Sequence, residues 1–178
     1  MNLSTRRNFF AKAAGAAAAL AGAPKLFAQQ AAAAKPHHHE PSNHVRDGVF
    51  YFYGTGSNDG FPPSDHVLVT DPFEKHVTRT MDALKKSLEE QGCTMDSILH
   101  LQVFTCLPLS DSTPMPTGKA RFDAHKAQYD ALNKIYRTYF SPGKSPSRAC
   151  MAVEWIPGDS LIEIVGSAVV VAAPSSAS

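Results

Sequence analysis

The sequence predicts an α+β domain in which a mixed β-sheet carries two helices on one of its faces. Three observations support this class. Short apolar runs are bounded by glycine and proline, two longer stretches have apolar residues at helical spacing, and the two kinds of segment alternate. Their order is two strands, a helix, a strand, a helix and two final strands. This order is typical of one sheet with both helices packed on the same side.

The first part of the 178-residue chain is typical of an export signal. Residues 4–10, STRRNFF, resemble the twin-arginine motif, and an alanine-rich stretch without charges follows over about 13–23. That stretch is shorter than the roughly 20 residues that span a bilayer. We therefore expect a twin-arginine-type signal peptide over 1–34, a linker over 35–44, one domain over 45–178, and a periplasmic protein. An alanine-rich first helix of the mature domain is the alternative.

Composition limits the kinds of partner. The formal net charge is +1 with acids and bases interspersed, which argues against a nucleic-acid partner and, once the signal is removed, against a membrane partner. We expect small molecules and other copies of the chain instead. The cysteines, Cys93, Cys106 and Cys150, are odd in number and form no CxxC pair, so a disulfide framework is not expected.

Histidines raise a metal hypothesis at one place only. The run at His37–His39 lies in the linker, where adjacent imidazoles can bind a transition metal but nothing fixes their geometry. A solvated tail is the favoured interpretation, so we expect no metal site and no cofactor. Later histidines are dispersed along separate elements and form no recognisable ligand set; they are His66, His76, His100 and His125.

The first half of the domain predicts two strands and a helix. Residues 49–53, VFYFY, and 66–70 are the strand candidates, separated by a loop rich in glycine and proline. A helix should begin at Asp71-Pro72, where a cap residue precedes proline at the first helical position, and end at Gly92. Its apolar residues recur at helical spacing and should lie on the sheet; they are Val77, Met81, Leu84 and Leu88.

The second half predicts a strand, a helix and a closing strand pair. Residues 98–105 form a strand candidate in which Leu99, Leu101 and Val103 share one face. A helix over 121–140 has an apolar stripe made of Phe122, Tyr129, Leu132 and Tyr136. Residues 149–155 and 161–172 then form two strands, which we expect to pair as a hairpin through the turn at 157–159.

Two charges interrupt this apolar final segment, Arg148 at a strand entrance and Glu163 between two isoleucines. A buried ion must be paired or it costs several kcal/mol. An arginine can hold a carboxylate through two parallel hydrogen bonds, and a glutamate in an apolar pocket is suited to proton transfer. Spacing alone leaves two interpretations equally open: a ligand-binding pair, or a structural ion pair across the hairpin.

Residues 145–169, SPSRACMAVEWIPGDSLIEIVGSAV, resemble the C-terminal motif of the Rid (YjgF-like) family of imine and enamine deaminases. In that pattern Pro-x-Arg-x-Cys precedes an Ile-Pro turn and an Ile-Glu-Ile strand, so Arg148, Cys150, Pro157 and Glu163 match it. Asn133-x-x-Tyr136-x-x-Tyr139-Phe140 is similar to the family's Asn-x-x-Tyr-x-x-Phe-Phe helix. The resemblance extends over roughly residues 41–172.

The resemblance implies a homotrimer of chorismate-mutase-like fold with active sites in clefts between subunits. Arg148 would bind the carboxylate of a 2-imino or 2-enamino acid, with Gly54, Tyr53, Cys150 and Asn133 contributing to the substrate site. Glu163 would position the water that attacks the imine carbon, which yields a 2-oxo acid and ammonia without a cofactor. Cys150 is expected to be a wall of the pocket rather than a nucleophile.

Alternatives remain open within this resemblance. The family's first hairpin usually carries Ser-Gly-Gln, whereas this chain has Tyr53-Gly54-Thr55, so the shape of the pocket can differ. A Rid-like module that binds a small carboxylate without catalysis is the main rival to the deaminase. The ribonuclease activity attributed to some relatives fits poorly, because the domain lacks a basic stripe with interleaved aromatic residues.

Overall fold

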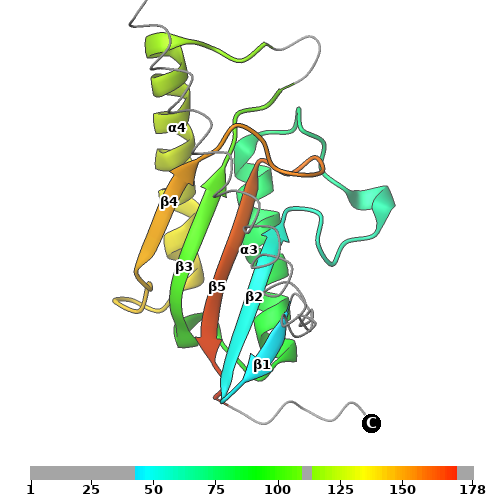
Figure 1. Cartoon of the computed structure of the whole chain (residues 1–178), viewed down its shortest axis with the longest axis vertical. Coiled ribbons are helices and arrows are strands. Elements are labelled where there is room, and N and C mark those ends of the chain that lie inside the picture. The colour runs from blue at the N-terminus through cyan, green and yellow to red at the C-terminus, as the bar shows by residue number, and fades with distance from the viewer. Residues whose placement is uncertain (1–42, 110–113, 172–178) are drawn as a thin grey trace, which may run out of the picture. The chain divides into compact units, whose positions relative to one another are not determined.

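A computed structural model describes residues 43–109 and 114–171 of the chain. Within these residues five strands form one mixed sheet in the order β1-β2-β5-β3-β4 (Figure 1). The elements are β1 (His44–Arg46), β2 (Val49–Gly56), α3 (Phe73–Glu90), β3 (Ile98–Thr105), α4 (Gly118–Tyr136), β4 (Arg148–Ala152) and β5 (Ile162–Val169). The predicted signal peptide and the His37–His39 run lie outside the described residues.

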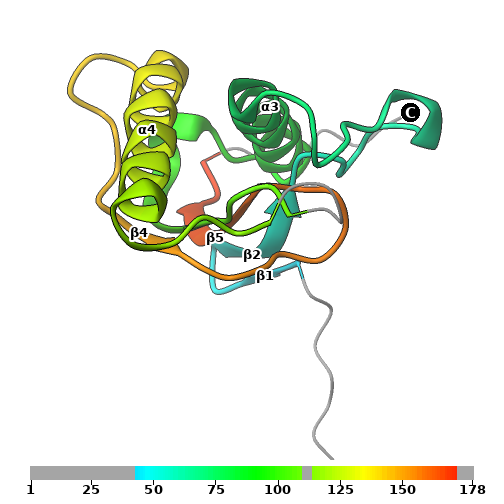
Figure 2. The same ribbon diagram turned by 90° about the horizontal axis from the view of Figure 1, so that it is seen from above.

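Both helices pack on the same face of the sheet, as the sequence predicts (Figure 2). The core between the helices and the sheet contains Phe50 and Phe52 of β2, Leu101 and Val103 of β3, and apolar residues of both helices. The α+β class, with a mixed sheet and two helices on one face, is therefore confirmed. None of the helices in the described part of the chain is long and apolar enough to cross a membrane.

Helix α3 begins close to its predicted start. Pro72 is the residue before the first helical turn, and the Asp71 carboxylate accepts hydrogen bonds from the Leu68 backbone N–H (2.9 Å) and from Lys75 Nζ (3.1 Å). These contacts fix the loop that leads into the helix. The predicted apolar stripe of this helix is fully buried, and His76 and Thr80 are buried beside it.

The predicted closing hairpin is wrong. Strand β4 pairs in parallel with β3, and β5 lies between β2 and β3, antiparallel to both. Residues 149–155 also form a shorter strand than predicted, because β4 ends at Ala152. The connection through Gly158 is a crossover to the centre of the sheet, which buries Ile162 and Ile164 of β5 completely. A hairpin through residues 157–159 would instead have placed β5 beside β4, which is the edge strand.

Other differences have local causes. Residues 66–70 are not a strand, and the sheet instead gains β1 at the end of the predicted linker. Leu99 is 52% exposed because the β3–β5 register shifts between Ile98 and His100, so it does not share the buried face of its neighbours. On α4, Phe122 and Tyr129 are also exposed, and the buried part of the stripe begins further along the helix.

Candidate functional site

The Arg148 guanidinium lies under α4, on the face of the sheet that the helices cover. Arg148 pairs with the buried Leu101 in β3, so their side chains share that face. Its Nη2 donates a hydrogen bond to Asn133 Oδ1, and its Cζ lies 4.0 Å from the centre of the Tyr136 ring. No carboxylate within residues 43–109 and 114–171 forms an ion pair with Arg148. The cation is therefore held by neutral groups.

Tyr136 also belongs to this site, although its helical spacing predicts only a core residue. It is 2% exposed, yet its hydroxyl has no hydrogen-bond partner in the described part of the chain. Burial raises the pKa of this phenol, although the positive charge of Arg148 opposes the shift. A neutral buried O–H without an acceptor costs free energy unless a ligand supplies one. In the sequence, the one signal that points to Tyr136 as a site residue is the resemblance of Asn133-x-x-Tyr136 to the family's helix motif.

Cys150 lies two residues beyond Arg148 on the same face of β4, and it is half-buried against the core. Burial raises the pKa of the Cys150 thiol, with Arg148 only partly opposing this effect. A thiol that stays protonated near neutral pH is a poor nucleophile. The role of Cys150 as a wall of a substrate pocket stays a prediction. We call Arg148, Asn133, Tyr136 and Cys150 the Arg148 half-site.

Glu163 lies on the opposite face of the sheet. Its neighbours Ile162 and Ile164 belong to the core, and alternation along β5 places the glutamate on the face away from the helices. Its carboxylate lies beside Gly54, where a methyl group added to the glycine would be 3.7 Å from Glu163 Oε2. Gly54 has a φ of +65° within a bulge of β2. We call Gly54 and Glu163 the Glu163 half-site.

Tyr53 precedes Gly54 in the bulge and is 51% exposed. Its backbone N–H donates to Asn43 Oδ1 (2.9 Å), and its ring stacks on His44 with 6.3 Å between ring centres. It also lines a pocket of about 250 Å³ together with Thr55 and residues of α3, including Ala83 and Lys86. The phenol is therefore open to solvent in a single chain.

The predicted site residues thus fall into two groups. Arg148 and Cys150 of β4 lie with Asn133 of α4, whereas Gly54 and Glu163 lie together on the other face. Tyr53 belongs to neither group and is exposed beside Gly54. The alternative of an ion pair between Arg148 and Glu163 across a hairpin is wrong, since β3 separates their strands. Within the described residues no group of three or more histidine, cysteine or acidic side chains is arranged so that it could bind a metal ion.

Comparison with known proteins relates this architecture to one family. No protein-family model matches the chain. Solved structures do match it. A Rid-family protein of unknown function from Yersinia pestis has a TM-score of 0.55 and 20% identity, covering 74% of this chain and 88% of that one. RidA from an Antarctic Psychrobacter has a TM-score of 0.53 and 16% identity, covering 76% and 91%.

A third similar structure is a Thermotoga maritima protein that is described provisionally as an endoribonuclease. It has a TM-score of 0.54 and 24% identity, and the match covers 76% of this chain and 89% of that chain. These likenesses span most of each neighbour. The chain therefore has the fold of the Rid (YjgF-like) proteins, and the resemblance seen in residues 145–169 is confirmed at the level of structure.

Proposed function

We propose that this chain is a hydrolytic deaminase that converts 2-imino and 2-enamino acids into 2-oxo acids and ammonia. The observation that carries the proposal is the Arg148 guanidinium, which is half-buried, aligned by Asn133, and not neutralised by any carboxylate in residues 43–109 and 114–171. Asn133 Oδ1 accepts from one of its nitrogens, and a guanidinium carries five N–H donors, so others are available to an anion. A carboxylate is the matching ligand, because it accepts two parallel hydrogen bonds.

The reaction needs a water activator as well as an anion-binding group. Water adds to the imine carbon and forms a C–O bond, while the electron pair of the C=N bond moves to nitrogen, which takes a proton. In the resulting adduct the hydroxyl proton moves to the amino nitrogen, the oxygen electron pair forms the C=O bond and the C–N bond breaks, so that ammonia leaves and the 2-oxo acid remains. In this scheme Arg148 orients the substrate, and Glu163 accepts a proton from the water and returns it to nitrogen.

A complete site requires more than one copy of the chain in this proposal. Since Arg148 and Glu163 occupy opposite faces of one sheet, the Arg148 half-site of one copy is completed by the Glu163 half-site of a second copy. A closed ring in which each subunit contacts the next head to tail completes the site in every subunit. The homotrimer implied by the resemblance to the Rid family is such a ring. We therefore propose a homotrimer with sites between subunits.

The deaminase proposal is tested by generating 2-iminobutanoate or 2-iminopropanoate in situ and following release of the oxo acid. The chain should accelerate release, and Arg148→Ala should lower kcat/KM by about a hundredfold or more because the substrate carboxylate loses its partner. The matched control is Arg137→Ala, which removes an exposed arginine directly after α4. Equal rates with and without the protein would refute the proposal.

A binding module without catalysis is the second candidate, favoured by the division of the site into two half-sites. A single chain provides the anion-binding group but not the carboxylate beside it. In the same assay this candidate predicts no acceleration, together with binding of a 2-oxo acid that depends on Arg148. The presence or absence of acceleration separates the two candidates, and titration calorimetry with 2-oxobutanoate on wild type and Arg148→Ala tests the Arg148-dependent binding.

We also propose that the protein works in the periplasm after twin-arginine export. The support is the STRRNFF motif and the alanine-rich stretch that follows it. A reporter fused to residues 1–34 should reach the periplasm, and replacing Arg6 and Arg7 with lysine should stop translocation. Unchanged export of the lysine variant through the folded-protein route would contradict this assignment.

A further inference from the structure

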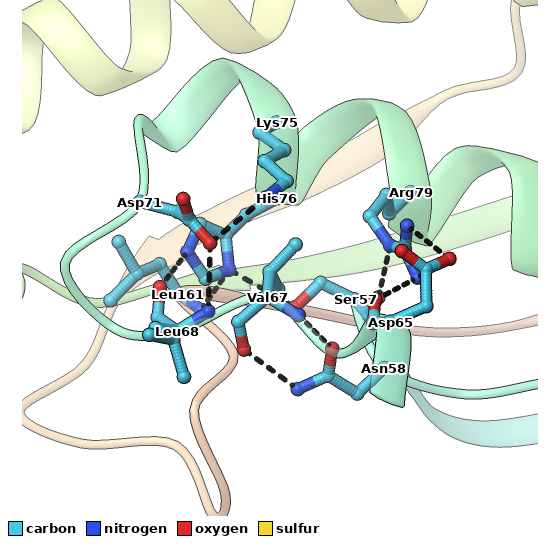
Figure 3. Close-up of polar contacts among 10 residues, drawn as sticks. All are labelled: Ser57, Asn58, Asp65, Val67, Leu68, Asp71, Lys75, His76, Arg79 and Leu161. Carbon is cyan, nitrogen blue, oxygen red and sulfur yellow. Dashed lines mark hydrogen bonds and ion pairs between the residues drawn. The ribbon is translucent and has the colours of Figure 1, made fainter. Parts of the chain in front are cut away.

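A buried polar network surrounds His76 on α3 (Figure 3). His76 is fully buried, and its Nδ1 accepts a hydrogen bond from the Leu161 backbone N–H (3.3 Å) while its Nε2 lies 3.0 Å from the Leu68 carbonyl oxygen. Since Nδ1 is an acceptor, the ring is neutral and its proton is on Nε2, which donates to Leu68. Ser57 Oγ lies 3.0 Å from the same Nδ1.

The network joins two strand ends that are distant in sequence. Ser57 directly follows β2, and Ser160 and Leu161 directly precede β5. Ser160 Oγ accepts a hydrogen bond from the Ser57 backbone N–H (3.1 Å), lies 3.0 Å from Ser57 Oγ, and donates to the Ile162 carbonyl (2.5 Å). The end of β2 is therefore tied to the start of β5 through His76 and two serines.

These strand ends carry the Glu163 half-site. Gly54 is three residues before Ser57, and Glu163 is two residues after Leu161. We propose that His76 is a positioning residue, which holds the Gly54 bulge and Glu163 in their mutual placement through its hydrogen bonds to Leu161 and Ser57. This inference rests on the proposed deaminase function, because it assigns His76 an effect on that reaction without contact with substrate.

The alternative that His76 anchors only the adjacent loop is also testable, because the loop has a separate anchor. Arg79 donates to the Asp65 carbonyl (2.6 Å), to the Asp65 carboxylate (3.1 Å) and to the Ser57 carbonyl (3.4 Å), and its guanidinium lies 3.6 Å from the centre of the Phe61 ring. Asn58 makes two further hydrogen bonds to Val67. The loop in Figure 3 is thus fixed independently of the bond from Leu161 to His76.

Protonation of His76 should release the strand end that it holds. A proton on Nδ1 would face the Leu161 N–H, so this bond would break and Ser57 would have to reorient. Burial lowers the pKa of His76 below its ordinary value; Asp71 and Asp159 oppose this shift and Lys75 adds to it. The network is therefore intact near neutral pH and should be lost only when the pH falls below this lowered pKa.

The experiment compares His76→Leu, His76→Gln and the control His66→Gln in the full chain. Leucine removes the hydrogen bonds of His76 to Leu161, Leu68 and Ser57, whereas glutamine keeps an acceptor and a donor. His66 is an exposed histidine of the same loop, and its imidazole lies 3.0 Å from the Phe61 carbonyl oxygen. We expect kcat of His76→Leu to fall about tenfold with KM changed less than about twofold, since Arg148 binds the carboxylate elsewhere. His76→Gln should recover most of kcat.

The pH profile distinguishes positioning from simple stabilisation. The wild-type kcat should fall as the pH drops through the folded-state pKa of His76, which lies below the ordinary value for histidine, and this acid limb should be absent from His76→Gln because glutamine does not titrate. Wild-type kcat and an unchanged acid limb in folded His76→Leu would overturn the inference even if that variant is less stable. If His76→Leu does not fold, Ser57→Ala removes the bridging hydroxyl alone, and a wild-type kcat there would overturn it equally.

A readout that does not need activity separates this inference from the proposed function. Amide hydrogen exchange over residues 160–164 should be faster in His76→Leu than in wild type at pH 7.5, while His76→Gln and His66→Gln should match wild type. If wild type has no deaminase activity, the proposed function fails and the exchange data still decide whether His76 holds this segment. Equal exchange in His76→Leu and wild type would overturn the network's role.

Discussion

At the scale of single residues, Arg148 differs from Arg79 and Arg121 in the groups that it contacts. Arg79 and Arg121 each contact a carboxylate, whereas Arg148 contacts an amide oxygen and the faces of Tyr136 and Tyr129. Aromatic faces stabilise a guanidinium without cancelling its charge. The cation is therefore ready to bind an anion without first breaking an ion pair.

The Cys150 thiol provides a prediction at this scale. Because burial raises its pKa, the thiol stays protonated near neutral pH and should not attack the imine carbon. Cys150→Ala should keep kcat within about threefold of wild type, with any loss due to a small change in the wall of the Arg148 half-site. Steady-state kinetics test this, and a loss approaching that of Arg148→Ala would show that the sulfur participates.

His76 should also make the stability of the protein depend on pH. Burial lowers its pKa in the folded chain below 6.5, so below pH 6.5 the unfolded chain binds a proton that the folded chain does not. Its contribution to the free energy of unfolding is complete above pH 6.5 and is lost as the pH falls through the folded-state pKa.

Urea denaturation at pH 7.5 and pH 5.0 measures this effect. The wild-type midpoint should be lower at pH 5.0, and His76→Gln should show a smaller difference between the two values. The control His66→Gln should retain the wild-type difference. An equal pH dependence in wild type and His76→Gln would assign the effect to other groups.

At the scale of secondary structure, the close packing of β5 against its neighbours depends on Gly166. A methyl group at this position would lie 2.5 Å from the His100 carbonyl oxygen and 2.9 Å from side-chain atoms of Leu101 and Phe52. Since the oxygen belongs to the backbone of β3, it cannot turn aside. Gly166→Ala should therefore lower the free energy of unfolding by about 3 kcal/mol.

Thermal or urea unfolding tests the Gly166 prediction. Gly143→Ala is the matched control for steric overlap, because nothing lies within 4 Å of the added methyl group there, although its φ of +77° still carries some strain. The loss in Gly166→Ala should clearly exceed the loss in Gly143→Ala. Similar losses of unfolding free energy in the two variants would mean that β5 can move away from β3 and β2 at Gly166 at little cost.

The sequence predicts the identity of most elements but not their order in the sheet. Strand 98–105 and the start of α3 follow from local signals, namely alternation and a proline after a cap residue. The central place of β5 depends on pairing with β2, more than a hundred residues earlier, and no local pattern encodes it. Likewise Leu99 alternates correctly in sequence, and only the register shift in the folded sheet exposes it.

The candidate site shows the same division. The motif resemblance identifies Arg148 and Glu163, but their separation onto opposite faces depends on the strand order, so the sequence suggested a hairpin pair instead. Tyr136 has the spacing of a core residue, and its unsatisfied hydroxyl becomes visible only when its neighbours are known. Local sequence therefore indicates which residues are candidates for the site, while the pairing of distant strands decides on which face of the sheet each one lies.

At the scale of the whole molecule, the proposed trimer makes the face of the sheet without helices an interface. Val165 lies at the centre of this face, on β5 opposite Gln102, and it is half-buried in the single chain. Val165→Asp should place a charge in the interface and convert a species of about three chains into monomers. Deaminase activity should be lost with it, because each site would lack its second half.

Size-exclusion chromatography with light scattering tests this prediction. Lys85→Glu is the control, since it reverses an exposed charge on α3, on the other side of the sheet, and loses only a 3.9 Å ion pair with Glu89. The control should remain trimeric and active. A monomeric wild type with full activity would contradict both the trimer and the shared site.

The central position of β5 has a consequence for biosynthesis. This strand joins the β1–β2 pair to the β3–β4 pair, yet its residues are among the last described ones to leave the ribosome. Until they emerge, each pair exposes an unsatisfied edge, so the polypeptide cannot complete its tertiary structure during translation. Premature termination before residue 162 should thus leave a product that proteases degrade, so only a chain that includes β5 should accumulate in the cell.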